Sequence, residues 1–192
     1  MTLRVGNVCS TGCVTYGESS LGPLELIDGC WALGDPKRPG GARVEFRPDG
    51  LHAHGRDSAV EVIPWARIML GFRITLGGRY PNRDVYTQMG VLGGLPGPFK
   101  GRGGGYLHMT VRHPYEDREL FFDRHPRWYR TKDILTLQTV MTHLLADGEA
   151  HRLGDPDWLA RVVAHLSTFD GWATTRGLRR AATEAVDAAG SS

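Results

Sequence analysis

A run of short alternating segments separated by tight turns, between residues 42 and 76, constrains the fold more than any other feature. In the segment 42–47, Val44 and Phe46 share one face and charged residues occupy the other. A period of two is typical of a half-buried β-strand. The turn that follows, Pro48-Asp49-Gly50, combines a residue that fixes φ with two that tolerate positive φ. The pattern predicts consecutive antiparallel strands.

The same alternation continues on both sides of this run. After strands over 51–55 and 59–63, Pro64 predicts a bend or bulge, because proline cannot donate to a strand ladder. A longer strand over 65–76 places Ile68, Leu70, Phe72 and Ile74 on one face. Residues 24–33 read as one strand with Trp31 as its core anchor. The remaining strand candidates are 3–8, 84–92, and a hairpin formed by 106–113 and 119–124.

The pattern changes from strand to helix near residue 130. Thr131 is a plausible N-cap, and Gly148 follows the last turn as a helix stop. A second helix is expected from Asp155 as N-cap and Pro156 at the first position. The tail from residue 175 is rich in Ala and Arg and is expected to be helical and frayed. The apolar residues at helical spacing in the first of these helices are Ile134, Leu137, Val140, Met141, Leu144 and Leu145.

These elements predict an α+β protein: an antiparallel β-barrel or strongly bent sheet, capped by a C-terminal helix, with one or two extra helices. We divide the chain into an irregular N-terminal segment (1–23), a barrel with its capping helix (24–147), and a helical extension with a frayed tail (148–192). The expected core includes Val44, Phe46, Ile68, Leu137 and Leu144.

Composition excludes several classes of partner. The net charge of +2 gives no global basic field for nucleic acid or an anionic membrane. No apolar run approaches the roughly 18 residues of a membrane span, and no secretory leader is visible, so we expect a cytoplasmic protein. Three cysteines (Cys9, Cys13 and Cys30) do not make a disulfide framework. No cofactor is predicted.

His52 and His54 form the first candidate site. Residues two apart in a strand share a face, so both rings could reach one metal ion, with Glu61 seven residues after His54. This would be a metal-dependent enzyme of the cupin type. The competing interpretation is that both histidines are polar surface residues while Leu51 and Ala53 face the core.

Three further clusters have both a functional and an ordinary interpretation. The residues from His113 to His125 are dense in acid–base groups, but we favour a solvated turn. The Gly-rich loop 93–105 contains Lys100 and Arg102 but does not match a phosphate-binding loop, so we interpret it as a mobile loop that could touch a partner. Lys37 and Arg38, with Arg73, Arg79 and Arg83, either line one end of the barrel or are scattered surface charge.

The order of strands followed by one strong helix resembles a pleckstrin-homology-like domain of the bacterial type. The segment 46–74 is similar to the strand–turn–strand part of such domains, with Ile63-Pro64-Trp65 as the step into the next strand. The resemblance covers about residues 24–147, whereas the helix 155–169 and the tail depart from it. It implies a domain without enzymatic activity whose ligands are peptides, protein partners or, in some members, lipid headgroups.

The sequence therefore favours a non-enzymatic cytoplasmic interaction or scaffold module that binds a protein or peptide, and it is compatible with an oligomer. An exposed edge strand could accept an extended peptide. The second helix and the tail could pack on another chain through Trp158, Val162, Leu166 and Trp172. The alternatives are the cupin-type enzyme of His52, His54 and Glu61, and an accessory protein of an actinobacterial plasmid or developmental system. The expected partner-binding residues are Lys37, Arg38, Lys100, Arg102, Trp158 and Trp172.

Overall fold

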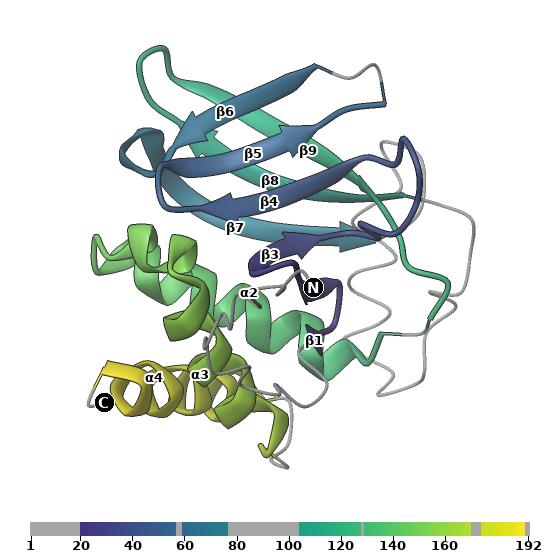
Figure 1. The fold of residues 1–192 in the computed structure, drawn as a ribbon. Helices are drawn as coiled ribbons and strands as arrows, with labels where there is room; N and C mark the ends of the chain where they lie inside the picture. The colour runs from purple at the N-terminus through teal and green to yellow at the C-terminus, as the bar shows by residue number, and fades with distance from the viewer. Residues whose placement is uncertain (1–19, 57–58, 77–103, 128, 170–173, 191–192) are drawn as a thin grey trace, which may run out of the picture.

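The computed structural model describes residues 20–56, 59–76, 104–127, 129–169 and 174–190, and it confirms an α+β protein with two antiparallel sheets and helices gathered on one side of them (Figure 1). The strands of the first sheet are β1 (Ser20–Leu21), β2 (Leu24–Ile27), β3 (Cys30–Leu33), β4 (Arg43–Arg47), β5 (Gly50–His54) and β6 (Val60–Pro64). The second sheet contains β7 (Ile68–Leu76), β8 (Gly104–Val111) and β9 (Glu116–Asp123). The helical elements are η1 (Trp65–Arg67), α2 (Thr131–Ala146), η2 (Ala150–Gly154), α3 (Pro156–Ser167) and α4 (Thr175–Gly190).

The first sheet is a meander in which each strand pairs with the next along the chain. The single strand expected over residues 24–33 is wrong, because the chain turns back at Asp28-Gly29 and forms β2 and β3. Both turn residues have positive φ (51° and 77°), as a two-residue type I′ hairpin requires. The Asp-Gly pair is a typical hairpin sequence, and the prediction of a single strand did not take it into account. β1 lies within the segment that was expected to be irregular.

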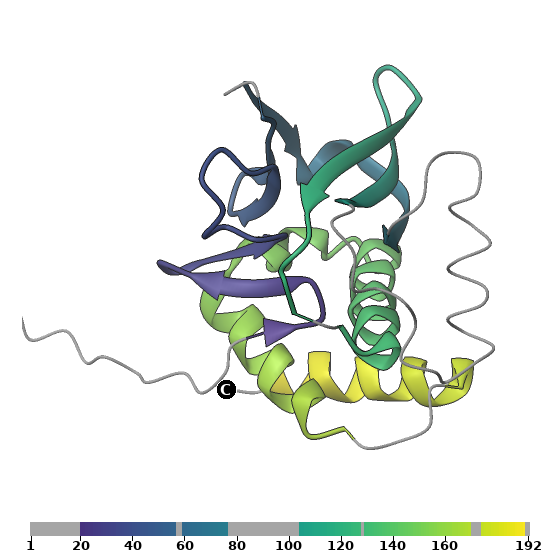
Figure 2. The same ribbon diagram turned by 90° about the vertical axis from the view of Figure 1, so that its right-hand side faces the viewer.

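The second sheet lies across the first, with the β8–β9 hairpin projecting beyond the helices (Figure 2). The strands in the described ranges form two sheets, and no closed barrel is found among them. The sheets are linked at one corner, where the Asp123 N–H donates to the Ala42 carbonyl at 2.8 Å. The chain passes from β6 to β7 through Pro64 and η1, so the bend expected at Pro64 is present.

Leu70 does not lie on the buried face that the alternation in 65–76 predicted. Its exposed fraction is 58%, whereas those of Ile68, Phe72 and Ile74 are 4% or less. The β7–β8 register shifts between Ile68 and Leu70 and again between Leu70 and Arg73, and Gly71 has a φ of 52°. A bulge inserts a residue and rotates the side chains around it, so strict alternation fails there.

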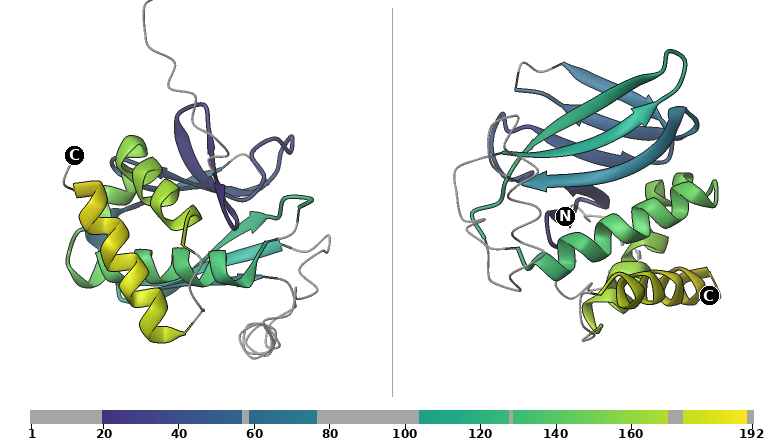
Figure 3. Two further views of the ribbon diagram at one scale, coloured as in Figure 1. Left: turned by 90° about the horizontal axis from the view of Figure 1, so that it is seen from below. Right: turned by 180° about the vertical axis from the view of Figure 1, so that it is seen from behind.

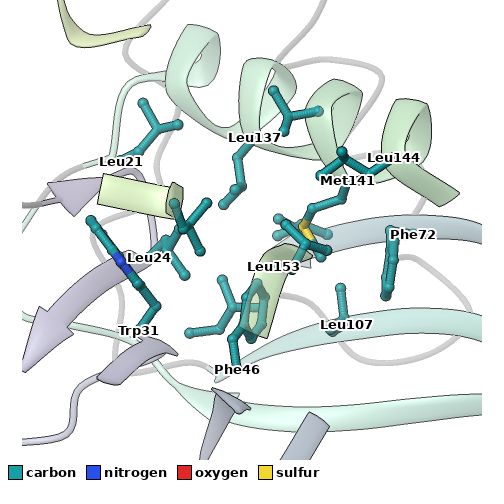
Figure 4. Packing of buried hydrophobic residues seen from close by; sticks show 14 of the residues in the cluster. Leu21, Leu24, Trp31, Phe46, Phe72, Leu107, Leu137, Met141, Leu144 and Leu153 are labelled. Atoms are coloured by element: carbon teal, nitrogen blue, oxygen red, sulfur yellow. The ribbon is translucent and has the colours of Figure 1, made fainter. Parts of the chain in front are cut away.

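The core lies between the two sheets and the helices (Figure 4). The residues expected in it, Val44, Phe46, Ile68, Leu137 and Leu144, are all buried, with exposed fractions of 4% or less. At least one α2 side chain also completes a strand edge. Gln138 accepts a hydrogen bond from the N–H of Ile74 at 3.0 Å, and α2 runs alongside β7 (Figure 3). Helix α2 therefore covers an edge of the second sheet and fills the core.

Helix α4 packs on both α2 and α3, and all three helices belong to the same hydrophobic cluster. The start of α3 is as expected: Asp155 accepts from the N–H groups of Asp157 and Trp158, and Pro156 opens the helix. Trp31 of β3 donates through Nε1 to the Pro156 carbonyl at 3.0 Å, which ties the helical extension to the first sheet. The N-cap of α2 is Arg130 rather than Thr131, and its side chain makes no capping bond. None of the helices in the described ranges has the length and apolarity to cross a membrane.

Because of the bulge, we expect two neighbouring alanine substitutions to differ widely in how much stability they remove. Leu70→Ala should change the free energy of unfolding by no more than about 0.5 kcal/mol, because the side chain is exposed. Phe72→Ala should lower it by about 3–5 kcal/mol, because it removes a fully buried ring. Urea unfolding of both variants tests this; equal losses would show that the strand alternates through Leu70.

Candidate functional site

The two sheets meet at Asp123, the last residue of β9. Its carboxylate accepts from the Ala42 N–H at 2.8 Å, from Arg56 Nη2 at 2.8 Å and from Arg38 Nη1 at 3.2 Å. Its carbonyl accepts from the Asp35 N–H at 2.9 Å. Burial raises the pKa of Asp123, but the bonds from Arg56 and Ala42 outweigh it and hold that pKa below its usual range. The residue is a charged clamp between β9 and the start of β4.

Away from this clamp the sheets separate and leave a cleft of about 500 Å³ between β5–β6 and β9. Arg56 spans it, with its guanidinium 5.2 Å from the centre of the Phe121 ring. At the β6 side, Glu61 forms an ion pair with Arg118 of β9. The side chains that line the cleft include Ala53, His54, Arg56, Val60, Glu61, Glu119 and Phe121.

Strand β6 forms the free edge of the first sheet beside this cleft. Val60 and Val62 are exposed there, with exposed fractions of 49% and 43%. The Gly55 N–H donates to the Ala59 carbonyl at 3.2 Å, which marks that opposed pair as hydrogen-bonded. Since such pairs alternate in an antiparallel ladder, Glu61 bonds toward β5, and the N–H and C=O groups of Val60 and Val62 point outward. The same two residues thus present apolar side chains and free backbone groups.

The outer face of the first sheet is organised around Glu45. This carboxylate accepts from Arg43 Nε and Arg47 Nε, each at 2.8 Å, and lies 3.2 Å from His54 Nε2. Burial alone would raise the pKa of Glu45, but the hydrogen bonds from Arg47 and Arg43 outweigh it and lower the pKa to about 2. Glu45 therefore neutralises a row of basic groups.

The structure does not bring together the three residues of the expected metal site. His52 contacts Asp49 at 2.9 Å, and His54 contacts Glu45. Glu61 lies directly opposite Ala53, so its side chain is on the other face of the sheet from both histidines. Nowhere in the described residues do three His, Cys, Asp or Glu side chains gather closely enough to hold a metal ion.

The residues expected to bind a partner differ in where the structure places them. Lys37 pairs with Glu25 at 3.3 Å, and Arg38 pairs with Asp123, so both contribute to contacts within the chain. Trp158 is 4% exposed and packs in the chain's own core, so it is not a surface contact. Val162 and Leu166, which were expected to pack on another chain with it, are buried in the same core. Lys100, Arg102 and Trp172 lie outside the described residues, as do Arg79, Arg83 and the strand candidates 3–8 and 84–92.

The cluster from His113 to His125 is not one solvated turn. Residues 116–123 form β9, and both Asp123 and His125 are buried. Burial lowers the pKa of His125 to about 4, and its Nδ1 lies 2.6 Å from the Tyr129 hydroxyl. The roles of Arg56 and Asp123 escaped sequence reasoning, because 67 positions separate the two residues and no local pattern relates them.

Two other hollows occur in the described parts of the molecule. One, of about 530 Å³, lies between α2 and α4 and includes Thr139, His143 and Arg179 in its lining. The other, of about 360 Å³, lies beside Trp65 and Arg112. Neither combines a free strand edge with exposed apolar side chains.

In comparisons with known proteins, no family model, no curated protein and no solved structure matches the chain.

Removal of the clamp should weaken the junction of the sheets. Asp123→Asn loses the charge that holds Arg38 and Arg56, and we expect the free energy of unfolding to fall by about 1–3 kcal/mol. Asp117→Asn is the matched control, because that exposed carboxylate of the same strand bonds only to the Thr110 hydroxyl among the described contacts. Chemical denaturation of both variants measures the difference; equal stability of D123N and wild type would contradict the clamp.

Glu45 predicts an acid-dependent loss of stability. Its pKa of about 2 in the folded protein lies below the ordinary value of 4.5, so its contribution to stability is present above pH 4.5 and is lost as the pH falls toward 2. At pH 6 we expect the free energy of unfolding of wild type to be about 1–2 kcal/mol higher than that of Glu45→Gln. This value is kept small because solvent partly screens the exposed arginine partners. Unfolding curves from pH 6 to pH 2 should show the two proteins converging; a gap that stays constant would contradict the assignment.

Proposed function

We propose that this chain is a non-enzymatic interaction module that binds an extended peptide segment of another protein by strand addition at β6. The observation that supports this most is the coincidence at Val60 and Val62 of exposed apolar side chains with outward backbone N–H and C=O groups. Strand addition uses both: backbone hydrogen bonds give affinity, and alternate side chains give specificity.

The other sheet edges in the described strands are protected in ways that natural proteins use against unwanted pairing. β1 has only 2 residues, and β7 is covered by α2 through Gln138. β9 displays the charged run Glu116, Asp117, Arg118 and Glu119. β6 has valines where such an edge would be expected to have lysine or another charge.

The site also limits what the peptide can be. β6 has 5 residues and ends at Pro64, which has no N–H to donate. The peptide therefore pairs over about three to five residues in an extended conformation. Its apolar side chains at alternate positions lie beside Val60 and Val62, and the residues between them face the cleft, where Arg56, Glu61 and Arg118 offer both signs of charge.

The resemblance to pleckstrin-homology-like domains forms part of this proposal. Antiparallel strands followed by α2 support it, and it implies peptide or protein ligands rather than catalysis. A cytoplasmic location and the absence of a cofactor belong to the same proposal. Two copies of β6 could also pair with each other about a twofold axis, and the experiment below separates that case.

Peptides selected from a random display library on the wild-type protein provide the test. The double variant Val60→Lys/Val62→Lys should weaken their binding at least about ten-fold, because it removes the apolar contact and places charge at the edge. Leu70→Lys is the matched control, since it adds charge at an exposed leucine on another strand and should leave binding unchanged.

Hydrogen exchange gives a second, position-specific readout. In the free protein the amides of Val60 and Val62 should exchange fast while that of Glu61 is protected, and bound peptide should slow the exchange of both valines. Equal binding by wild type and the double variant, or unchanged exchange at the valines, contradicts the proposal. Concentration-dependent dimerisation that the lysines abolish, without any selected peptide, would identify a second copy as the occupant.

A further inference from the structure

Strand β6 has one charged residue, Glu61, and this residue faces the cleft between the two sheets. Successive side chains of a strand point to opposite faces, so Glu61 lies on the other side of β6 from Val60 and Val62. The cleft beside it, between β5–β6 and β9, has a volume of about 500 Å³. A peptide strand that pairs with β6 follows the same alternation, so its residue opposite Glu61 enters this cleft.

The backbone pairing of β6 brings that peptide residue close to Glu61. The N–H and C=O groups of Glu61 bond toward β5, so Glu61 and the residue opposite it on an antiparallel peptide form a non-hydrogen-bonded pair. The Cα atoms of such a pair are only about 4.5 Å apart, and their side chains interact. The charge of the peptide residue at this position therefore affects binding directly.

The charges already present in the cleft favour a basic residue there. Arg118 of β9 forms an ion pair with Glu61 and lies 3.7 Å from Glu116, so two carboxylates share one guanidinium. Arg56, which also lines the cleft, donates to Asp123 at 2.8 Å. Both of these cations have carboxylate partners, so an acidic peptide residue would bring another carboxylate to groups that are already paired.

The rest of the lining supports the same choice. Glu119 adds a further carboxylate, 3.3 Å from His108 Nδ1, and Ala59 and Phe121 contribute apolar surface. A lysine or arginine has an aliphatic stem that lies along apolar surface while its charged end reaches a polar group. The cleft therefore offers both kinds of contact that a long basic side chain makes.

We propose that the peptide bound at β6 carries a lysine or arginine between two apolar residues, and that this basic side chain enters the cleft and pairs with Glu61. This inference rests on the strand addition proposed above and names the class of peptide that the edge selects. The two apolar residues lie beside Val60 and Val62 on the outer face, and the basic residue shares Glu61 with Arg118 on the inner face.

Three peptides of the sequence Thr-Val-Xaa-Val-Thr, acetylated and amidated at their ends, provide the test, with lysine, glutamine or glutamate at Xaa. NMR titration of the ¹⁵N-labelled protein follows the amides of Val60 and Val62 and gives a Kd for each peptide. We expect the lysine peptide to bind about three-fold more tightly than the glutamine peptide, and the glutamate peptide about three-fold more weakly. Salt at about 1 M should reduce both differences, because it screens charges near the surface.

Glu61→Gln distinguishes a pair with Glu61 from general attraction by the protein. It should remove most of the preference for lysine over glutamate and leave the affinity for the glutamine peptide close to that of wild type. Glu184→Gln is the matched control, because it neutralises an exposed carboxylate that pairs with Arg180 on α4, across the molecule from β6 (Figure 1). This control should keep the full preference of wild type.

The outcomes separate this inference from the proposed function. Equal affinities for the lysine and glutamate peptides, or a preference that E61Q keeps unchanged, would overturn the inference and leave strand addition standing. Binding of library-selected peptides with acidic residues opposite Glu61, together with no binding of the lysine peptide, would have the same meaning. If neither the library nor these three peptides bind at β6, strand addition fails and the basic residue fails with it.

Discussion

Asp123 joins the two sheets, and the position of the candidate site follows from that junction. It is a buried carboxylate whose main chain and side chain together form hydrogen bonds with Asp35, Arg38, Ala42 and Arg56. Where these bonds end, β9 and β6 diverge, and the cleft opens between them. The interior on one side of this junction is filled by α2, so the sheets do not need to close on each other to exclude water.

The edge strands of the two sheets differ in how their backbone and side chains are protected, and β6 is the least protected of those described. β7 has its free N–H at Ile74 satisfied by Gln138, and β9 carries charge, but β6 leaves Val60 and Val62 exposed. An exposed apolar edge is a liability for an isolated protein, because it pairs with any extended chain. The partner that we propose for that edge would account for its composition.

Much of the fold was predictable where a local pattern had a local cause. Asp155 with Pro156 marked the start of α3, and the apolar spacing after residue 130 marked α2. The sequence pattern failed at Leu70, where Gly71 permits a bulge that rotates the strand, and at Asp28-Gly29, where a hairpin signal was read as strand interior. The predicted metal site is wrong because the pairing of β5 with β6 places Glu61 on the opposite face of the sheet from the two histidines.

By itself, the sequence determined the class of the protein, its strand-then-helix order and most of its core, because side-chain periodicity depends only on backbone geometry within a segment. Tertiary structure alone decided which charges are buried and what they meet. Arg56 reaches Asp123 across the junction, and Trp158 enters the core instead of the surface. These outcomes depend on contacts between segments distant in the chain, and no local pattern encodes such contacts.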